Sequence, residues 1–300
     1  MVKTYSQLYL ECRRALRTQE ADHDATFIAR QFLCHFTGKP FEKLLGDMNM
    51  YVGDEICAAM EDATKRYLKG EPLAYILGEW EFYGLDLYVS PSVLIPRDDT
   101  CAVVSLAINQ ALFLPEEPRI LDLCTGSGCI GLAIASRVKD AWVTLADLSK
   151  EAMAVARKNI ARHKLSGKVS VVHVNALEEP PAFLGKFDMI VSNPPYITSE
   201  EMRELDTSVI DHEPHMALFG GEDGLDFYRA IAKNYREALK PGGYLAFEYG
   251  DTQADDVCRI LEENGYTILE RTRDFNDRER AVLAQYSGKE GNYGDEKDCL

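Results

Sequence analysis

The sequence predicts an α/β protein with a mostly parallel, seven-stranded sheet, preceded by a small helical bundle and a β-hairpin linker. From about residue 97 onward, apolar β-rich runs alternate with helical stretches, which is typical of a parallel sheet with helices on both faces. Before residue 75, apolar residues instead recur at helical spacing. The hydrophobic content of 46% and charged content of 27% are ordinary for a soluble globular protein.

Helices are expected throughout residues 1–75, the first predicted domain. Leu8, Cys12 and Leu16 recur at helical spacing, and two further apolar stripes occupy residues 27–36 and 56–68. Glycine and proline follow both later stripes and are expected to end those helices. Residues 76–96 form the predicted β-hairpin linker, because aromatic and β-branched residues there surround Gly78 and Gly84.

Residues 97–287 form the predicted sheet domain. Its strands are expected at 120–123, 142–146, 169–174, 187–191, 244–247, 267–269 and 281–284, and its helices near 99–113, 129–138, 149–164, 225–239 and 252–263. The last two strands have no helix between them, which predicts an antiparallel edge. The polar segment 288–300 is expected to be disordered.

A glycine-rich loop follows the first strand of the sheet domain. Residues 122–131 read D-L-C-T-G-S-G-C-I-G, in which Gly126, Gly128 and Gly131 fit G-x-G-x-x-G. Such glycines allow a tight turn and a close approach of the backbone to a ligand at a helix N-terminus. Asp147 ends the second strand, where an acidic residue reads ribose hydroxyls in nucleotide-binding folds. A ligand-free turn, an NAD site and another adenosine site all fit this pattern.

Asp122 favours one of these cofactors. A carboxylate there can pair with an ammonium group but would repel the pyrophosphate of a dinucleotide. S-adenosylmethionine has an ammonium group and no phosphate. Asn175 ends the third strand, where it is placed to meet the adenine edge. Together with L-K-P-G-G-Y at residues 239–244, these features resemble the class I (Rossmann-like) S-adenosylmethionine-dependent methyltransferases.

The sequence N-P-P-Y at residues 193–196 ends the fourth strand and predicts the acceptor site. The Asn193 side chain and the Pro194 carbonyl offer two acceptor oxygens, while prolines have no N–H. Such a corner suits a flat –NH₂ group, on which Tyr196 would stack. Accepting both N–H bonds stabilises the positive charge that develops on the nitrogen. A strand-ending turn whose tyrosine merely packs is the alternative.

Several motifs in order resemble the HemK/PrmC family of protein-(glutamine-N5) methyltransferases. They are G-E-P-L-A-Y-I-L-G-E-W-E-F-Y-G-L, V-L-I-P-R-D-D-T, D-L-C-T-G-S-G, V-S-N-P-P-Y-I and E-P-H-M-A-L-F-G-G-E-D-G-L-D-F-Y-R, which span most of residues 70–285. The resemblance implies S-adenosylmethionine as methyl donor and, as acceptor, the glutamine of the Gly-Gly-Gln motif of peptide chain release factors. It also implies that the helical domain and hairpin help to dock that protein substrate.

The predicted site follows from the motifs and the resemblance together. The catalytic residues are Asn193, Pro194 and Tyr196. The cofactor-binding residues are Asp122, Cys124, Thr125, Gly126, Ser127, Gly128, Asp147, Asn175, Ala176 and Asn193. The substrate-binding residues are Asn193, Pro194, Pro195, Tyr196, Arg97 and Glu213, and no metal site is expected.

Some positions depart from the family pattern, and others carry a second interpretation. Cys101 stands where the family commonly has Glu. Asn175-Ala176 stands where the family often has Asp and a bulky residue, which leaves the packing of the adenine open. F-E-Y-G at residues 247–250 replaces L-E-x-G. Arg97 could anchor the segment that covers the cofactor or a substrate backbone, or it could form an ordinary salt bridge. Glu213 could fix the loop over the site, or it could be a solvated loop carboxylate.

The net charge and the cysteine pattern limit the partners and the cellular location that we expect. A net charge of −16 disfavours a broad grip on phosphate backbones, and the first 75 residues are close to neutral. A DNA or RNA amino-methyltransferase and a non-catalytic cofactor-binding module remain the alternatives, while an NAD dehydrogenase would leave N-P-P-Y unused. The 8 scattered cysteines lack a C-x-x-C pair, which favours reduced thiols in the cytoplasm. No membrane span or nucleic-acid partner is expected, and we expect a monomer.

Overall fold

The computed structural model describes residues 3–288, apart from the side chains of residues 207 and 208. The predicted disorder of residues 288–300 therefore falls almost wholly outside the described residues. The chain divides into two compact units. The helical unit comprises the residues up to Trp80 with Val89–Pro91 and Asp206–His212, and the sheet unit comprises Glu81–Tyr88, Ser92–Leu205 and the residues from Glu213 onward.

The helical unit is built from short amphipathic helices around one apolar core. They are α1 (Tyr5–Leu16), α2 (Asp22–Thr37), α3 (Phe41–Asp47), α4 (Asp54–Tyr67) and α5 (Leu73–Leu77), and α9 (Thr207–Ile210) also belongs to this unit. Leu16, Phe32 and Leu33 are fully buried in this core. At the start of α1, Thr4 and Gln7 form a capping box.

Two helices of this unit were not expected from the sequence. Pro40 and Pro72 mark helix ends in the sequence pattern, yet each is the N-cap of a following helix, α3 or α5. Both helices are too short to show a helical period. Ile76 consequently lies in α5, and the hairpin begins later than predicted, with β1 (Glu79–Phe82) and β2 (Leu85–Tyr88). Tyr83 and Gly84 join these strands with φ values of 52° and 80°, as a two-residue hairpin turn requires.

The sheet of the second unit has the predicted seven strands, in the order β5-β4-β3-β6-β7-β9-β8. They are β3 (Arg119–Leu123), β4 (Trp142–Asp147), β5 (Val169–His173), β6 (Phe187–Ser192), β7 (Leu239–Glu248), β8 (Tyr266–Arg273) and β9 (Glu279–Tyr286). The first five in this order run parallel, and β9 is antiparallel to both β7 and β8, as predicted. The strand order reverses between β3 and β6, where Leu123 pairs with Ser192.

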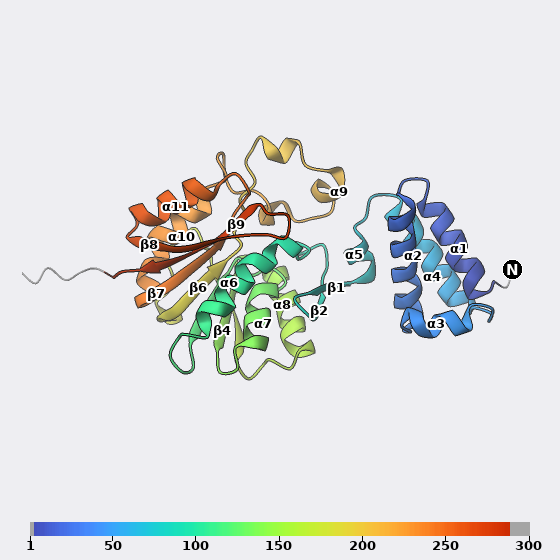
Figure 1. The fold of residues 1–300 in the computed structure, drawn as a ribbon, viewed down its shortest axis with the longest axis horizontal. Coiled ribbons are helices and arrows are strands. Elements are labelled where there is room, and N and C mark those ends of the chain that lie inside the picture. The colour runs from blue at the N-terminus through green and yellow to red at the C-terminus, as the bar shows by residue number, and fades with distance from the viewer. Residues whose placement is uncertain (1–2, 289–300) are drawn as a thin grey trace, which may run out of the picture. The chain divides into compact units, whose positions relative to one another are not determined.

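Helices cover both faces of the sheet, as Figure 1 shows. The helices α6 (Cys101–Ala111), α7 (Cys129–Arg137) and α8 (Lys150–Arg162) pack into one apolar cluster, and α10 (Asp226–Asn234) and α11 (Ala254–Glu263) pack into the other. Strand β6 is buried along its whole length because both faces are covered. Among residues 3–288, no helix combines the length and apolar character needed to cross a bilayer.

Candidate active site

The glycine loop and the N-P-P-Y corner begin side by side at the reversal of strand order. The loop follows Leu123 at the end of β3, and the corner follows Ser192 at the end of β6. The Ser192 hydroxyl donates a hydrogen bond of 2.7 Å to the Leu123 carbonyl, which ties the two strand ends together. In open α/β sheets, ligands bind beyond the carboxyl ends of strands at this kind of position.

Asp147 at the end of β4 holds the glycine loop. Its Oδ2 accepts a 2.8 Å hydrogen bond from the Gly126 backbone N–H, and its Oδ1 accepts a 2.9 Å bond from the Ser149 N–H. Burial raises the pKa of this carboxyl, while hydrogen bonds from Ser149 and Gly126 lower it. Because Gly126 lies with φ of +55° and a Cβ there would enter open space, the loop leaves room for a ligand beside Asp147.

The other two glycines of the motif serve packing and the turn. Gly128 has φ of +87°, a conformation that favours glycine. At Gly131, on the first turn of α7, a Cβ would come within 2.2 Å of Leu145 Cδ2 and 3.0 Å of Asp122 Oδ2. The third glycine therefore permits α7 to lie close against β4 and β3.

Asp122 does not reach the pocket, in contrast to its predicted role as partner of a cofactor ammonium group. It is fully buried, and its Oδ2 accepts hydrogen bonds from the Thr125 hydroxyl at 2.5 Å and from the Gly131 N–H at 2.9 Å. Burial raises its pKa to about 7 against these two bonds. From the buried strand, Asp122 therefore stabilises the glycine loop by hydrogen bonds and does not line the pocket.

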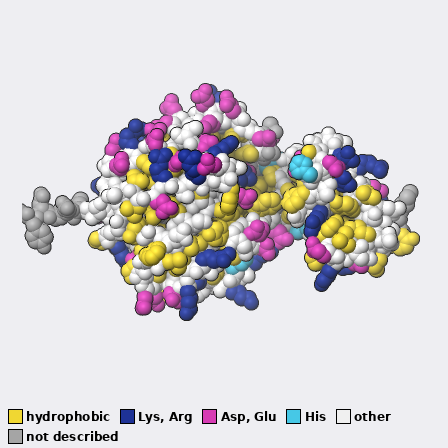
Figure 2. All heavy atoms as spheres, viewed as in Figure 1, with side chains coloured by type: hydrophobic (Ala, Val, Ile, Leu, Met, Phe, Trp, Pro, Cys, Tyr) yellow, Lys and Arg dark blue, Asp and Glu magenta, His cyan; other side chains and the backbone are white. Residues whose placement is uncertain are grey.

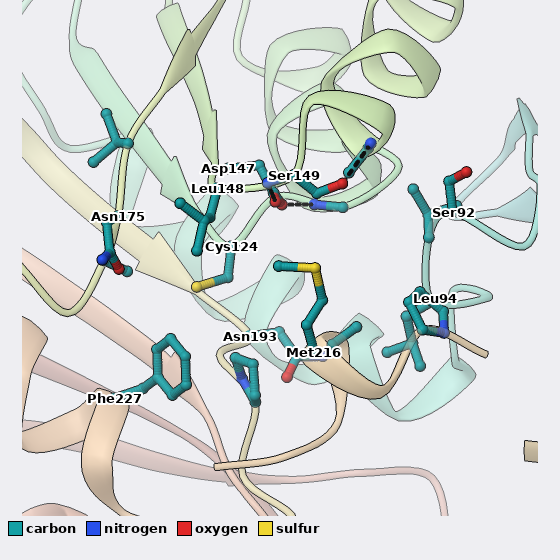
Figure 3. A pocket seen from close by; sticks show the side chains of 18 residues that line it. Ser92, Leu94, Cys124, Asp147, Leu148, Ser149, Asn175, Asn193, Met216 and Phe227 are labelled. Carbon is teal, nitrogen blue, oxygen red and sulfur yellow. Dashed lines mark hydrogen bonds between the residues drawn. The ribbon is translucent and has the colours of Figure 1, made fainter. Parts of the chain in front are cut away.

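A pocket of about 700 Å³, partly open to solvent, lies over these strand ends (Figure 3). Seven predicted site residues line it: Cys124, Gly126, Asp147, Asn175, Ala176, Asn193 and Pro195. The predicted residues Asp122, Thr125, Ser127, Gly128, Pro194, Tyr196, Arg97 and Glu213 are not part of its lining.

The sequence reasoning missed eleven lining residues from five segments. They are Ser92, Val93, Leu94, Leu148, Ser149, Ala152, Val174, Pro214, Met216, Ala217 and Phe227. Leu148 and Ser149 directly follow Asp147, so the strand-end rule could have included them. Residues 92–94 and 214–217 belong to loops within the family-like motifs, but a loop gives no periodic signal that shows where it folds.

Cys124 is a strained residue in the lining. It has φ of +59°, a region that favours glycine, and its thiol points into the pocket in Figure 3. Burial raises the pKa of this thiol, so it remains neutral at physiological pH. The cysteine therefore offers the pocket a neutral, polarisable surface.

Asn175 uses its side chain locally. Its Nδ2 donates to Glu178 Oε1 at 2.9 Å, and its Oδ1 accepts from the Leu177 N–H at 3.1 Å. Because Ala176 is small, other residues supply most of the apolar surface on this side of the pocket. Phe227 on α10 lies on the same side of the pocket as Asn175 in Figure 3, and Val174 and Leu148 also line it. A flat ring can pack against this wall despite the departure at residue 176.

The N-P-P-Y corner is fixed by its surroundings. Asn193 Nδ2 donates to Thr100 Oγ1 at 3.3 Å, and none of the described residues donates a hydrogen bond to Asn193 Oδ1. The Tyr196 carbonyl accepts a 3.1 Å bond from Gln253 Nε2. Burial raises the pKa of the Tyr196 phenol, so this ring remains neutral.

Arg97 and Glu213 form an ion pair, which is the ordinary salt bridge considered for Arg97, and Glu213 is not the solvated loop carboxylate that was its alternative. The Glu213 side chain is almost fully buried, and its Oε2 also accepts a 3.3 Å bond from the Ile95 N–H. The pair joins two segments that carry pocket-lining residues, 92–94 and 214–217. Within residues 3–288, no group of three or more metal-ligating side chains could hold a metal ion.

Comparisons with known proteins match both units of the chain. The family model described as "Methyltransferase small domain" matches residues 103–222, and the one described as "PrmC N-terminal domain" matches residues 7–78. The release factor glutamine methyltransferase of Clostridium acetobutylicum is 42% identical over 235 residues, which cover 76% of this chain and 82% of that protein. The namesake in Geobacter sulfurreducens is 42% identical over 230 residues, covering 76% and 78%.

Two further relatives differ in length or in sequence. The bifunctional methyltransferase of Rickettsia typhi is 36% identical over 271 residues, which cover 85% of this chain but only 52% of that longer protein. Among solved structures, the hMettl16 catalytic domain in complex with a MAT2A 3′UTR hairpin has a TM-score of 0.52 at 17% identity. It covers 79% of this chain and 83% of that one. This last likeness concerns the fold alone.

Proposed function

Since the chain belongs to the release factor glutamine methyltransferase family, we propose that it transfers the methyl group of S-adenosylmethionine to the side-chain amide nitrogen of a glutamine. The acceptor is the glutamine of the Gly-Gly-Gln motif of peptide chain release factors. One observation carries the assignment to these residues: Gly126 of the glycine loop, Asp147 and Asn193 line a single pocket at the reversal of strand order.

The pocket fits S-adenosylmethionine in its donor groups and its apolar wall. Asp147 would bind the ribose hydroxyls, because each of its oxygens keeps a lone pair beyond the bonds to Gly126 and Ser149. Phe227 and Leu148 would pack against the adenine, and the open space at Gly126 would admit the methionine moiety. When bound, this cofactor supplies a methyl group on a positively charged sulfur that leaves with the C–S bonding electrons.

Asn193 and Pro194 would orient the glutamine amide. With Nδ2 engaged by Thr100, Asn193 keeps Oδ1 as an acceptor for one N–H of the substrate, and the Pro194 carbonyl accepts the other. Both bonds strengthen as the nitrogen becomes positively charged, so they stabilise the transition state more than the ground state. The amide proton becomes acidic only as the N–C bond forms and is then lost to water, so no strong base is required.

The other predicted residues would position the substrate amide and the segments that form the pocket. Tyr196, neutral and partly buried, would stack on the amide, and the Arg97–Glu213 pair would hold the segments over the pocket. The glycine loop would take its shape from its own residues Thr125, Ser127 and Gly128 and from the hydrogen bonds to buried Asp122. The helical unit would dock the release factor.

Charge supports a protein acceptor over a nucleic acid. The net charge is −16, and acidic and basic side chains are interspersed on the face of the sheet unit that Figure 2 shows. A phosphate backbone needs clustered positive charge. We place the protein in the cytoplasm, where release factors act, in keeping with the free thiols of its seven described cysteines. We also expect a monomer, which light scattering coupled to size exclusion would test.

The test is a methylation assay with purified protein, S-adenosylmethionine and release factor. We expect a mass increase of one methyl group on the tryptic peptide that contains Gly-Gly-Gln, and none when its glutamine is replaced by alanine. Asn193→Ala should abolish turnover while preserving most cofactor affinity. Transfer to DNA or ribosomal RNA without transfer to release factor would refute the proposal.

A further inference from the structure

We propose that Glu248 and Thr100 are positioning residues that fix the amide of Asn193, so that its Oδ1 faces the substrate and its Nδ2 faces away. The inference rests on the proposed function, because it assigns a purpose to residues behind the acceptor site. It concerns an arrangement that the glycine loop and the N-P-P-Y motif do not contain: a buried acid and a buried hydroxyl on two other elements.

Glu248 lies beside Asn193 because of the sheet register. Ser192 on β6 pairs with Phe247 on β7, so the next residue on each parallel strand is Asn193 or Glu248. Glu248 is 2% exposed, and its Oε2 is buried without a hydrogen-bond partner among the described residues. A buried carboxylate oxygen without a donor is costly, which indicates that a neighbouring N–H or O–H serves it in the working enzyme.

Thr100 supplies the second part of the arrangement. It occupies the N-cap position of α6, where a threonine hydroxyl usually accepts a bond from a backbone N–H of the first turn. Here its side chain makes no capping bond, and Oγ1 instead accepts from Asn193 Nδ2 at 3.3 Å. The hydroxyl still has its own proton to donate, and we assign the Glu248 carboxylate as its acceptor, because Thr100 lowers the pKa of that carboxyl.

These contacts select one orientation of the Asn193 amide. In the observed orientation, Nδ2 donates one proton to Thr100 and has the other available for Glu248, and Oδ1 is left for the substrate. In the reverse orientation, Oδ1 would lie beside the ionised carboxylate, and two acceptors would repel each other. A protonated Glu248 could instead donate to Oδ1, so protonation removes this selection.

The selection is therefore sensitive to pH. Burial raises the pKa of Glu248 to about 7, against the opposing effects of Thr100, Arg280 and Asn193. Below that pH the carboxyl is neutral, and above it the carboxylate holds Asn193 in the productive orientation. The charged and titratable groups that face Glu248 are Arg280 on β9, Asp99 and Cys101 before and at the start of α6, Cys129 on α7, Tyr196, and Tyr228 on α10. The thiols and phenols among them have pKa values raised by burial, so they remain neutral in this range.

The first experiment measures kcat for release factor at saturating S-adenosylmethionine from pH 5.5 to 8.5. In the wild type, kcat should fall on the acid side of about pH 7. Glu248→Gln should lower kcat about tenfold at pH 8, because a charged acceptor is lost, and should remove the acid limb. Thr100→Val should lower kcat by a similar factor, and Thr100→Ser should restore it to within about threefold. Cofactor affinity by calorimetry should change by less than about threefold in each variant.

The second experiment does not depend on turnover. With asparagine labelled by ¹⁵N, the side-chain amide signal of Asn193, assigned by its loss in Asn193→Ala, should shift with a midpoint near pH 7 in the wild type. In Glu248→Gln this shift should be absent. If Glu248→Gln keeps both the acid limb of kcat and the amide titration, the positioning role is refuted. If the wild type does not methylate release factor yet shows the amide titration, the proposed function fails and the positioning stands.

Discussion

At the scale of single residues, two acids that look alike in the sequence have different tasks. Asp122 and Asp147 each stand at the carboxyl end of a strand, next to the same glycine loop. Only Asp147 lines the pocket, while Asp122 is fully buried and bonds to Thr125 and Gly131. The difference arises because α7 packs on β3 and covers Asp122, whereas Asp147 at the carboxyl end of β4 faces the pocket.

We therefore expect Asp147→Asn to weaken cofactor binding. The substitution replaces a carboxylate oxygen with an N–H donor that faces either the Gly126 N–H or the ribose hydroxyls. Losing one charged hydrogen bond of this kind corresponds to about a tenfold or larger rise in the dissociation constant for S-adenosylmethionine. Isothermal titration calorimetry measures it.

Asp188 offers a matched control for this substitution. It is also a buried acid on a central strand, but it pairs with Lys240 and accepts from the Arg119 N–H at the other end of the sheet. Asp188→Asn should leave cofactor affinity unchanged. Equal affinity of the Asp147→Asn variant and the wild type would exclude the ribose-binding role.

At the scale of elements, the segment 218–224 encloses the N-P-P-Y corner. The Ile197 N–H donates to the Leu218 carbonyl at 2.9 Å, and the Gly220 N–H donates to the Ile197 carbonyl at 2.9 Å. Its glycines allow this contact, because a Cβ on Gly220 would lie 2.6 Å from the Pro195 carbonyl oxygen. The glycines of the F-G-G-E-D-G stretch thus allow this segment to pack directly against the backbone of the N-P-P-Y corner.

Gly224→Ala should consequently disturb catalysis more than cofactor binding. Gly224 has φ of +73°, and a Cβ there would lie 2.3 Å from the Tyr196 carbonyl oxygen and 2.6 Å from Gln253 Nε2. We expect the corner to shift, with kcat reduced at least about tenfold by a displacement of a few tenths of an ångström to one ångström, and stability reduced by about 1–3 kcal/mol. Steady-state kinetics and chemical denaturation measure both effects.

Gly167→Ala is the control for Gly224→Ala. Gly167 lies in the loop before β5, does not have a left-handed φ, and a Cβ there would meet nothing within 4 Å. We expect its stability to stay within about 0.5 kcal/mol of the wild type and its kcat to be unchanged. A Gly224→Ala variant that behaves like Gly167→Ala would show that the segment does not constrain the corner.

The elements also show what a sequence can predict. The strands and long helices of the sheet unit follow from their period and length, and the antiparallel edge follows from the missing helix before β9. The helices α3 and α5 have seven and five residues, which is too few for a period. The site was predicted where a strand end carries a marked motif, as at Asp147 and Asn193. Phe227 and Met216 could not be predicted, because only tertiary folding brings a helix and a loop to the pocket.

At the scale of the whole molecule, the stability of the fold depends on pH in two opposite ways, one set by buried acids and one by surface ion pairs. Glu71 has its pKa lowered by a hydrogen bond from Arg66, and Asp223 has its pKa lowered by one from Arg229. Such groups contribute stability above their unfolded pKa, which is lost in strong acid. Burial raises the pKa values of Asp122 and Glu248 to about 7, so they act in the opposite direction.

The stability of the chain should therefore fall between about pH 5 and pH 8. Asp122 and Glu248 have unfolded pKa values near 4, so the folded state holds more protons than the unfolded state between that value and about pH 7. Their contribution is fully present below the unfolded pKa and is lost as the pH rises through about 7. The growing negative charge of a chain with a pI of about 4.9 adds repulsion of the same sign. Calorimetry at pH 5 and pH 8 should show the lower Tm at pH 8.

Variants separate the buried acids from the general charge. Glu248→Gln and Asp122→Asn each remove one titrating buried group, so each should reduce the loss of Tm between pH 5 and pH 8. Glu263→Gln on the exposed surface of α11 removes the same unit of charge without removing a buried acid. If all three variants reduce the loss equally, net repulsion explains the pH dependence. A larger effect of the two buried substitutions assigns it to Asp122 and Glu248, the acids that support the glycine loop and the N-P-P-Y corner from behind.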